Sequence, residues 1–495
     1  MRAKTHVVHF IPIGNYMSTP PFIFTLFGAS GDLARLKLFP SLYQIGVQKK
    51  LPEKYHIVGF ARTKKTDEEF RKEFRASIEK KYGKLVDQSI LEKMLERVHY
   101  FAGDYSSKET FTEYHSYLST LVKATLTDID HLAYYSVPPV VFKDITQNLA
   151  ESFGDAKKRI KLIIEKPFGD SADSAEELFH FVLSHFDEAQ VYLLDHYLGK
   201  FAVQSILQLR HANRIMNHMM KGSEVANIQI TALENIGIGE RVGYFENTGI
   251  IKDMVQSHLL QTLALVTMSI PITEDADSVH RERSNILRAV HAPHNKDDII
   301  LGQYGSYRKE NGVPENSNTE TFVGLRLFID RESWYNVPIY LRTGKKTCEK
   351  HTFVVIELKK FAFQSEDEEP NRLVIELQPE EKISIKLLNK VGSTSDYQEV
   401  STSDNISCKI DGASCLPDHA SLILDAIQGR TTNFLSFPEI IATWKVTDKV
   451  LQVIKNEQIK PDRYEDGTCG PMTQHDLTSQ DGYEWYDVHL PGSHQ

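Results

Sequence analysis

The sequence has few cysteines and no long apolar run. Its 495 residues include four cysteines, which form no C-x-x-C pair and no spacing typical of metal ligands. The longest apolar stretch, residues 259–268, has about half of the ~20 residues that a membrane-spanning helix needs. We therefore expect no membrane span, no cysteine-bound metal, and reduced thiols in a cytoplasmic protein. The four cysteines are Cys348, Cys408, Cys415 and Cys469.

An excess of positive charge is also missing. The formal net charge is -10, from 57 basic and 67 acidic residues. This balance disfavours DNA, RNA and acidic membrane surfaces as partners, although a local basic cluster can still bind a small anion. Internal repeats and low-complexity tracts are absent as well, and the 41% of hydrophobic residues is enough to fill large cores. The composition is that of an ordinary soluble enzyme.

The length predicts two large domains after a short N-terminal extension, because 495 residues exceed what one compact core holds. Residues 1–20 are mildly apolar, but Pro12 interrupts them and no clear cleavage site follows. We expect a disordered or packed leader there. The periodicity changes near Lys200, which divides the remaining chain into residues 21–200 and 201–495.

Residues 21–200 alternate short apolar strands with amphipathic helices. The strands are I-F-T-L-F, Y-H-I-V-G-F-A, L-A-Y-Y-S-V, I-K-L-I-I-E and V-Y-L-L-D, separated by charged runs such as E-E-F-R-K-E-F-R. This alternation is typical of an α/β domain built on a Rossmann-type, doubly wound parallel sheet.

Beyond Lys200 the strands alternate apolar and polar residues. They are T-F-V-G-L-R-L-F-I, V-P-I-Y-L-R, F-V-V-I-E-L, L-V-I-E-L and I-S-I-K-L. Period-two alternation in successive strands favours a large antiparallel sheet with one face covered. Helices over 250–268 and 440–454 would pack on that face, which predicts an α+β domain.

A glycine turn follows the first strand, in F-G-A-S-G-D-L-A. Gly28 and Gly31 let the backbone turn tightly and approach a pyrophosphate at a helix N-terminus. Their G-x-x-G spacing is shorter than the full dinucleotide fingerprint, so an ordinary strand-to-helix turn remains an alternative. After the second strand, Arg62, Lys64 and Lys65 offer cations where an adenosine 2′-phosphate would lie. This favours NADP over NAD, although a solvated helix start has the same composition.

Charged side chains gather at the ends of the last two strands of this domain. E-K-P-F-G holds Lys166 in a fixed turn, where it can touch cofactor or substrate, or simply pair with a carboxylate. L-L-D-H-Y-L-G-K puts an acid, an imidazole, a phenol and an ammonium at a strand terminus, where α/β sheets bind ligands. Side chains this polar are rarely buried without partners, so the group indicates a site. Its members are Asp195, His196, Tyr197 and Lys200.

A second histidine follows in the helix G-I-I-K-D-M-V-Q-S-H-L-L-Q. Asp253 and His258 are five residues apart, about 140° around an α-helix after one full turn, so we expect them to share no narrow stripe. Beside two leucines, His258 could be an ordinary core histidine. Oxidation of a carbinol, however, needs a base with a pKa near neutrality, and a buried carboxylate such as Asp195 would align it.

Seven motifs spread over nearly the whole chain point to one family. They are G-A-S-G-D-L-A, I-I-E-K-P-F-G, D-H-Y-L-G-K, G-Y-F…G-I-I-K-D…H-L-L-Q, T-F-V-G-L-R-L-F-I-D, V-P-I-Y-L-R-T-G-K and N-R-L-V-I-E-L-Q-P. Together they resemble the glucose-6-phosphate dehydrogenases, and D-H-Y-L-G-K is highly specific for them. The resemblance implies oxidation of D-glucose 6-phosphate at C1 to 6-phospho-D-glucono-1,5-lactone with NADP. This is the first step of the oxidative pentose phosphate pathway, and the resemblance implies a homodimer or homotetramer.

The resemblance also implies roles for residues. His258 matches the general base and Asp195 its orienting carboxylate, with hydride passing to nicotinamide C4 and no metal needed. The clamp on the 6-phosphate is matched by His196, Tyr197, Lys200 and Lys350. The groups that bond the sugar hydroxyls are matched by Lys37, Glu234, Asp253 and Lys345. The cofactor contacts are matched by Gly28, Ser30, Gly31, Asp32, Leu33, Arg62 and Lys166.

The chain departs from the family pattern in four places. Phe201 replaces the glutamate that usually follows D-H-Y-L-G-K, and Ser257 replaces an asparagine before the base. Near the C-terminus, Cys469 replaces the aromatic residue of G-S-W-G-P. The usual Tyr-Glu-Arg ahead of L-x-L-D-A appears as His419, Ala420 and Ser421. These changes leave the catalytic set filled but put carried-over interface and regulatory contacts in doubt.

Two other functions remain open. A dehydrogenase that has drifted to another aldose phosphate or to NAD would keep the same motifs. A sensor or scaffold that binds nucleotide and sugar phosphate without turnover would not need both His258 and Asp195, so the sequence disfavours it.

Overall fold

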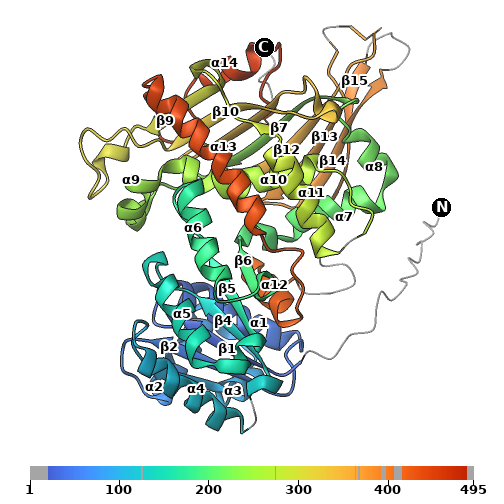
Figure 1. Ribbon diagram of the computed structural model, residues 1–495. Helices are drawn as coiled ribbons and strands as arrows, with labels where there is room; N and C mark the ends of the chain where they lie inside the picture. The colour runs from blue at the N-terminus through green and yellow to red at the C-terminus, as the bar shows by residue number, and fades with distance from the viewer. Residues whose placement is uncertain are drawn as a thin grey trace, which may run out of the picture.

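The computed structural model describes residues 20–487, except for residues 124–125, 274, 363, 366–367, 392–396 and 406–414. The expected extension over residues 1–20 lies outside the described residues apart from Pro20, as does Cys408. The described chain forms two large sheets with helices around each, and Figure 1 shows the N-terminal sheet below the C-terminal one.

The first sheet has six parallel strands in the order β3-β2-β1-β4-β5-β6. In this doubly wound order the winding reverses between β1 and β4, and ligands bind at the carboxyl ends of the strands. The predicted Rossmann-type fold is confirmed. The strands are β1 (Phe22–Phe27), β2 (Tyr55–Ala61), β3 (Val98–Ala102), β4 (Asp130–Tyr135), β5 (Ile160–Glu165) and β6 (Val191–Leu194). The helices are α1 (Phe39–Val47), α2 (Asp67–Tyr82), α3 (Gln88–Leu95), α4 (Lys108–Val122), α5 (Phe142–Ser152) and α6 (Ala172–Leu183).

The second sheet has ten strands, of which nine follow the order β15-β14-β13-β12-β7-β11-β10-β9-β16 while β8 pairs with β10. The large antiparallel sheet is confirmed, with two parallel pairs within it, β7 with β11 and β9 with β16. The strands are β7 (Val225–Leu233), β8 (Val290–His291), β9 (Ile299–Tyr304), β10 (Phe322–Ile329), β11 (Ile339–Gly344), β12 (His351–Leu358), β13 (Arg372–Gln378), β14 (Lys382–Lys390), β15 (Tyr397–Asn405) and β16 (Asp462–Tyr464).

Helices flank this sheet as predicted, but their arrangement differs from the expectation. The helix expected over 250–268 has two parts, the π-helix η9 (Ile251–Leu259) and α10 (Leu260–Thr267). The helix expected over 440–454 is α13 (Phe437–Asn456), which packs mainly on η9, α6 and α11 as an outer layer (Figure 1). The remaining helices are α7 (Phe201–Ala212), α8 (Arg214–Met219), α9 (Val242–Ile250), α11 (Ala276–Arg288), α12 (Asp418–Ile427) and α14 (Gln474–Ser479).

The opposite face of the second sheet is also covered at its centre, contrary to the expectation of one covered face. Gln229 on β7 is fully buried beneath the C-terminal segment. Its side chain donates to the backbone of Glu484 and accepts from the backbone of Tyr486. Trp485 packs its ring on Tyr340 of β11. The C-terminal segment thus supplies partners for polar side chains that would otherwise face water.

One C-terminal helix packs on the N-terminal domain. Helix α12 contacts α1 and the short helix η7 (His196–Gly199), and its apolar residues Leu422 and Ile423 belong to the same buried cluster as Phe24 and Leu26 of β1. Figure 1 shows α12 beside β6. The two halves of the sequence are therefore interlocked at this helix.

Within the described part of the chain, no helix combines the length and the apolar character that a membrane span requires.

Candidate active site

A carboxylate from the first domain and an imidazole from the second meet in the interior. Asp195, which follows β6, is fully buried, and His258 on η9 is 2% exposed. The His258 Nδ1 lies 2.8 Å and 3.0 Å from the two oxygens of Asp195. Burial alone would raise the pKa of Asp195, but the charges of His258 and Lys166 outweigh it and hold that pKa well below its usual range. The carboxylate is therefore ionised and can fix the imidazole by accepting from Nδ1.

Lys166 reaches this pair from the end of β5. Its Nζ lies 2.6 Å from His258 Nε2, and it donates to the Ser257 hydroxyl at 3.1 Å and to the backbone oxygen of Asp253 at 3.2 Å. Burial lowers the pKa values of both Lys166 and His258. Because the ammonium lies on the nitrogen that would accept a proton, it has to move aside before a hydroxyl group can reach that nitrogen.

The side chains around His258 also include the donor set of a metal site. Asp195, His196 and His258 offer ligand atoms that all lie within 4.8 Å of one another. However, both ring nitrogens of His258 already have partners, in Asp195 and Lys166. The arrangement therefore favours proton chemistry at His258 over metal ligation.

The π-helix brings Asp253 and His258 to one side of η9. The five-residue spacing predicts 140° between them only for an α-helix, and that expectation is wrong here. In a π-helix, hydrogen bonds join residues five apart, so such residues lie nearly above one another. The Asp253 carboxylate faces Arg241 at 3.0 Å and Lys345 at 3.4 Å. Burial would raise its pKa, but these cations together with Lys166 lower it to about 2.

A second carboxylate joins the same cation. Glu234, just after β7, lies 2.5 Å from the Nζ of Lys345, which follows β11. Lys345 therefore bridges Glu234 and Asp253, two groups predicted to bond sugar hydroxyls. Lys37 is not brought to them: it is exposed on η1 (Ala34–Leu38), where its charge acts on Lys81, and among the described contacts no hydrogen bond or ion pair links it to this group.

Two aromatic rings pack against His258, and a lysine lies over one of them. The Tyr197 ring stacks on the His258 ring at 3.9 Å, and the Nζ of Lys200 lies 4.1 Å from the Tyr197 ring centre. Burial lowers the pKa of Lys200 to about 8, and the positive charge of Lys350 contributes to the shift. Lys350 is exposed and His196 is half-buried. Two lysines whose positive charges act on each other indicate a place for an anion.

The glycine turn after β1 is tightly built. Gly28 has a φ of 85°, and a Cβ there would lie 2.0 Å from the backbone oxygen of Ser136 after β4. Its N–H donates to the backbone oxygen of Phe60 and to the Tyr105 hydroxyl. Gly31 donates back to Gly28. The turn therefore lies at the carboxyl edge between β1 and β4, where the winding reverses.

The other predicted cofactor residues lie around this turn. Asp32 is exposed 3.9 Å from Arg35, which also donates to the backbone oxygen of Ser30, and Leu33 is half-buried. Arg62 is exposed after β2, and its charge acts on Tyr105. Of the three cations expected after β2, Lys65 is engaged, because it pairs with Glu73 at 2.7 Å.

Sequence reasoning missed two residues at the site. His419 on α12 stacks parallel to His196 at 5.9 Å and lies 3.5 Å from Glu165. Arg241 pairs with Asp253. His419 was missed because only the packing of α12 on η7 brings it to the site. Arg241 was missed because it lies in the turn before α9, and only the fold brings this turn to Asp253.

Two sequence models of one family match the chain. The model described as the NAD binding domain of glucose-6-phosphate dehydrogenase matches residues 25–205, and that of the C-terminal domain matches residues 207–486. The glucose-6-phosphate 1-dehydrogenase of Chlamydia muridarum (strain MoPn / Nigg) is 34% identical over 492 residues, covering 94% of this chain and 97% of the relative. The chain belongs to the glucose-6-phosphate dehydrogenase family.

Further comparisons agree with membership of the glucose-6-phosphate dehydrogenase family. The glucose-6-phosphate 1-dehydrogenase of Bacillus subtilis (strain 168) is 32% identical over 491 residues, covering 95% of this chain and 99% of the relative. A solved glucose-6-phosphate dehydrogenase in complex with its substrate glucose 6-phosphate has a TM-score of 0.88 and 31% identity, covering 95% of this chain and 100% of that chain.

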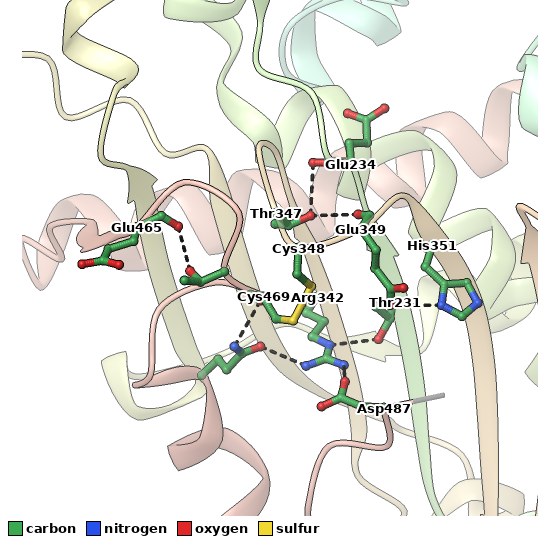
Figure 2. The surroundings of a disulfide bond; sticks show 12 residues. Thr231, Glu234, Arg342, Thr347, Cys348, Glu349, His351, Glu465, Cys469 and Asp487 are labelled. Carbon is green, nitrogen blue, oxygen red and sulfur yellow. Dashed lines mark hydrogen bonds and ion pairs between the residues drawn. A yellow bond between two sulfur atoms is a disulfide. The ribbon is translucent and has the colours of Figure 1, made fainter. Parts of the chain in front are cut away.

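The chain contains disulfides where reduced thiols were expected. Cys348 and Cys469 are bonded with their Cα atoms 4.9 Å apart, although 121 residues separate them (Figure 2). Cys415 is disulfide-bonded as well. The expectation of reduced thiols is wrong because the absence of C-x-x-C pairs excludes only local pairing, whereas here the fold brings distant segments together. Two other residues that depart from the family pattern are also placed. Phe201 is exposed on α7, and the Ser257 hydroxyl still accepts a hydrogen bond from Lys166.

Proposed function

We propose that this chain is an NADP-dependent glucose-6-phosphate 1-dehydrogenase that oxidises C1 of glucose 6-phosphate to the 1,5-lactone. The observation that carries the proposal is the buried pair of Asp195 and His258 at the carboxyl edge of the doubly wound sheet, with Lys166 on the reactive nitrogen. Family membership supports the substrate, since the related structure is described as a complex with glucose 6-phosphate.

In this proposal His258 is the general base and Asp195 orients it. Nε2 accepts the proton of the C1 hydroxyl, while the Nδ1–H donor stays on the carboxylate of Asp195. The ionised Asp195 then stabilises the imidazolium that forms. Lys166 leaves Nε2 when the substrate binds and contacts substrate or cofactor instead.

The substrate is held at both ends. Lys200 and Lys350 bind the 6-phosphate, together with His196 and Tyr197, which lie beside His258. The sugar hydroxyls are bound by Glu234, Asp253 and Lys345, which lie together, and Lys37 joins them only by moving from its exposed position on η1. Phosphate binding far from C1 supplies energy that orients the reacting carbon.

The cofactor is proposed to bind at the turn after β1. The fit is supported by Gly28, since its positive φ and its close approach to Ser136 leave no room for a side chain, as a tight turn that brings its backbone to a pyrophosphate requires. The turn residues Gly28, Ser30, Gly31, Asp32 and Leu33 would hold the dinucleotide. When bound, the nicotinamide accepts the hydride from C1. Arg62, which is exposed after β2, favours NADP because it can pair with the 2′-phosphate.

The setting of the enzyme is proposed on the same basis. We infer a division near Lys200 into a cofactor domain (21–200) and a substrate and dimerisation domain (201–495), preceded by the extension over 1–20. We further infer a cytoplasmic homodimer or homotetramer, with a mass two or four times the 56.5 kDa of one chain, and no nucleic acid or membrane partner.

The test is a spectrophotometric assay of the purified chain with glucose 6-phosphate and either NADP or NAD. We expect reduced nicotinamide to appear, faster with NADP. His258→Asn should lower kcat by about a hundredfold or more, because no other side chain takes the proton. His218→Asn, on an exposed position of α8, is the matched control and should leave the rate unchanged. A wild-type rate in His258→Asn would end the assignment of the base, and calorimetric binding without lactone formation would favour a sensor.

A further inference from the structure

The first turn of α12 brings a further histidine to the proposed phosphate clamp. His419 is the second residue of α12, and its side chain is 11% exposed. Its ring lies parallel to the ring of His196, with 9° between the two planes and 5.9 Å between the ring centres. His419 is one of the residues that depart from the family pattern, so the resemblance assigns it no role.

The ring of His196 is held by other rings. Its centre lies 5.4 Å from the ring centre of Tyr197, 4.8 Å from that of His258 and 5.9 Å from that of His419. Within the residues that the structure describes, neither nitrogen of His196 has a hydrogen bond or an ion pair. A ring without such bonds keeps its rotamer through packing alone. Loss of the His419 ring would therefore leave His196 free to change its orientation.

The ring of His419 is itself fixed against the parallel sheet. Its Nε2 lies 3.5 Å from Oε1 of Glu165, and the same oxygen accepts a hydrogen bond from the Tyr134 hydroxyl. Glu165 is the last residue of β5 and Tyr134 lies in β4, two neighbouring strands of the first sheet. Because the side chains of His419 and Glu165 are only 11% and 13% exposed, water screens this pair less than a surface pair. The His419 ring therefore offers His196 a fixed surface.

Helix α12 reaches a second member of the clamp as well. It packs on η7, the segment that carries His196, and the charge of Asp418 acts on Lys200. The start of α12 is thus placed against both an imidazole and an ammonium of the clamp. Of its first two residues, His419 is the one whose ring contacts His196.

We propose that His419 is a positioning residue for the 6-phosphate, and that its ring holds His196 in the orientation in which an imidazole nitrogen donates to a phosphate oxygen. The inference rests on the proposed function, because it takes His196 as part of the phosphate clamp. His419 acts through His196 and touches no reacting atom. Substrate affinity in this chain thus depends on a ring supplied by its C-terminal half.

The test compares the unmodified chain with His419→Ala. We expect the KM for glucose 6-phosphate to rise about fivefold or more, because the His196 side chain must then be ordered on binding. The inhibition constant of inorganic phosphate, as a competitor of glucose 6-phosphate, should rise by a similar factor, since phosphate alone reports on the clamp. The kcat and the KM for NADP should change by less than about twofold, because Asp195 and the glycine turn still hold the base and the cofactor. An unchanged KM would overturn the proposal, as would a raised KM with an unchanged inhibition constant, because the effect would then lie outside the clamp.

Further variants show that the ring is what matters. His419→Phe should raise the KM for glucose 6-phosphate by less than about twofold, because a phenyl ring can still stack on His196. A KM as high as that of His419→Ala would overturn the positioning role, since the imidazole itself would then be needed. His419→Gln keeps a polar group for Glu165 without a ring, so it should have the high KM and decides the question if His419→Ala does not fold. Ser421→Ala, two residues further along α12, is the matched control and should leave the KM unchanged.

Calorimetric titration with glucose 6-phosphate separates this proposal from the proposed function. A weaker affinity in His419→Ala than in the unmodified chain supports the positioning role, even where neither protein shows turnover and the proposed activity fails. Equal affinities of the two proteins would overturn the role. A lower unfolding temperature of His419→Ala with an unchanged affinity would also overturn it, because His419 would then stabilise the fold alone.

Discussion

At the scale of single residues, the environment of His258 decides at which pH it can act as a base. The imidazole is almost fully buried between Asp195, Lys166 and the ring of Tyr197. Burial disfavours the imidazolium and lowers the pKa from the ordinary value of 6.5, while Asp195 opposes the shift and Lys166 adds to it. The base therefore stays neutral, and competent, at a pH where an exposed histidine is already half protonated.

This shift predicts the acidic limb of the pH profile. A plot of kcat/KM against pH reports the free enzyme, so it should fall as the pH drops through the pKa of His258, with a midpoint below 6.5. Asp195→Asn removes the charge that raises this pKa, so the midpoint should move lower still, together with a loss of kcat because the imidazole is no longer oriented. A midpoint at or above 6.5 in the unmodified chain would contradict this account.

At the scale of elements, a kink just before η9 sets the direction of the helix that carries the proposed base, His258. Gly249, the second-to-last residue of α9, has a φ of 67° and a ψ of 173°, a conformation that residues other than glycine rarely adopt. A Cβ on Gly249 would lie 2.1 Å from Glu320 Oε1, which accepts from the backbone N–H of Ile251 at the first turn of η9. The start of the helix that carries Asp253 and His258 thus requires glycine.

Gly249→Ala should therefore disturb both stability and activity. We expect a loss of roughly 1–3 kcal/mol in the free energy of unfolding from the strained backbone, and more if Glu320 cannot move. The kcat should fall as well, since η9 positions His258. Gly243→Ala on α9 is the matched control, because nothing lies within 4 Å of its Cβ, and it should be neutral or slightly stabilising. Thermal unfolding and the dehydrogenase assay measure both effects, and equal behaviour of the two variants would contradict the role of the kink.

At the scale of the whole molecule, α12 connects the two halves of the chain at the site. Its first residue, Asp418, approaches Gly199 so closely that a Cβ on Gly199 would lie 2.4 Å from the Asp418 backbone oxygen. Gly199 ends η7, the helix that carries His196 and Tyr197. The glycine of D-H-Y-L-G-K is thus required by a segment more than two hundred residues away.

Gly199→Ala should push α12 away from η7. We expect the free energy of unfolding to fall by about 1–3 kcal/mol, as for an overpacked core. The KM for glucose 6-phosphate should rise, because η7 holds part of the proposed phosphate clamp. Gly305→Ala, whose nearest atom would be an ordinary 3.5 Å away, is the control and should change neither quantity. Unfolding midpoints and initial rates test this, and an unchanged KM in Gly199→Ala would show that α12 does not support the clamp.

Much of the fold could be predicted because burial leaves a periodic pattern along each element. The parallel sheet followed from apolar strands between amphipathic helices. β3 was missed because V-H-Y-F-A is a short edge strand with half-buried positions. β7 was missed because its polar residues Asn227, Gln229 and Thr231 face inward, where Glu357, Arg342 and the C-terminal segment supply their hydrogen bonds.

The sequence by itself determined the class of fold, the family, and the cluster of Asp195, His196 and Tyr197, because strand ends of a doubly wound sheet share one edge. Tertiary structure alone decided that Lys166 lies on His258, that a π-helix turns Asp253 toward the same side, and that Cys348 meets Cys469. Local patterns depend on neighbours a few residues away, whereas these contacts depend on which surfaces of separate elements pack together. No spacing along the chain records that choice.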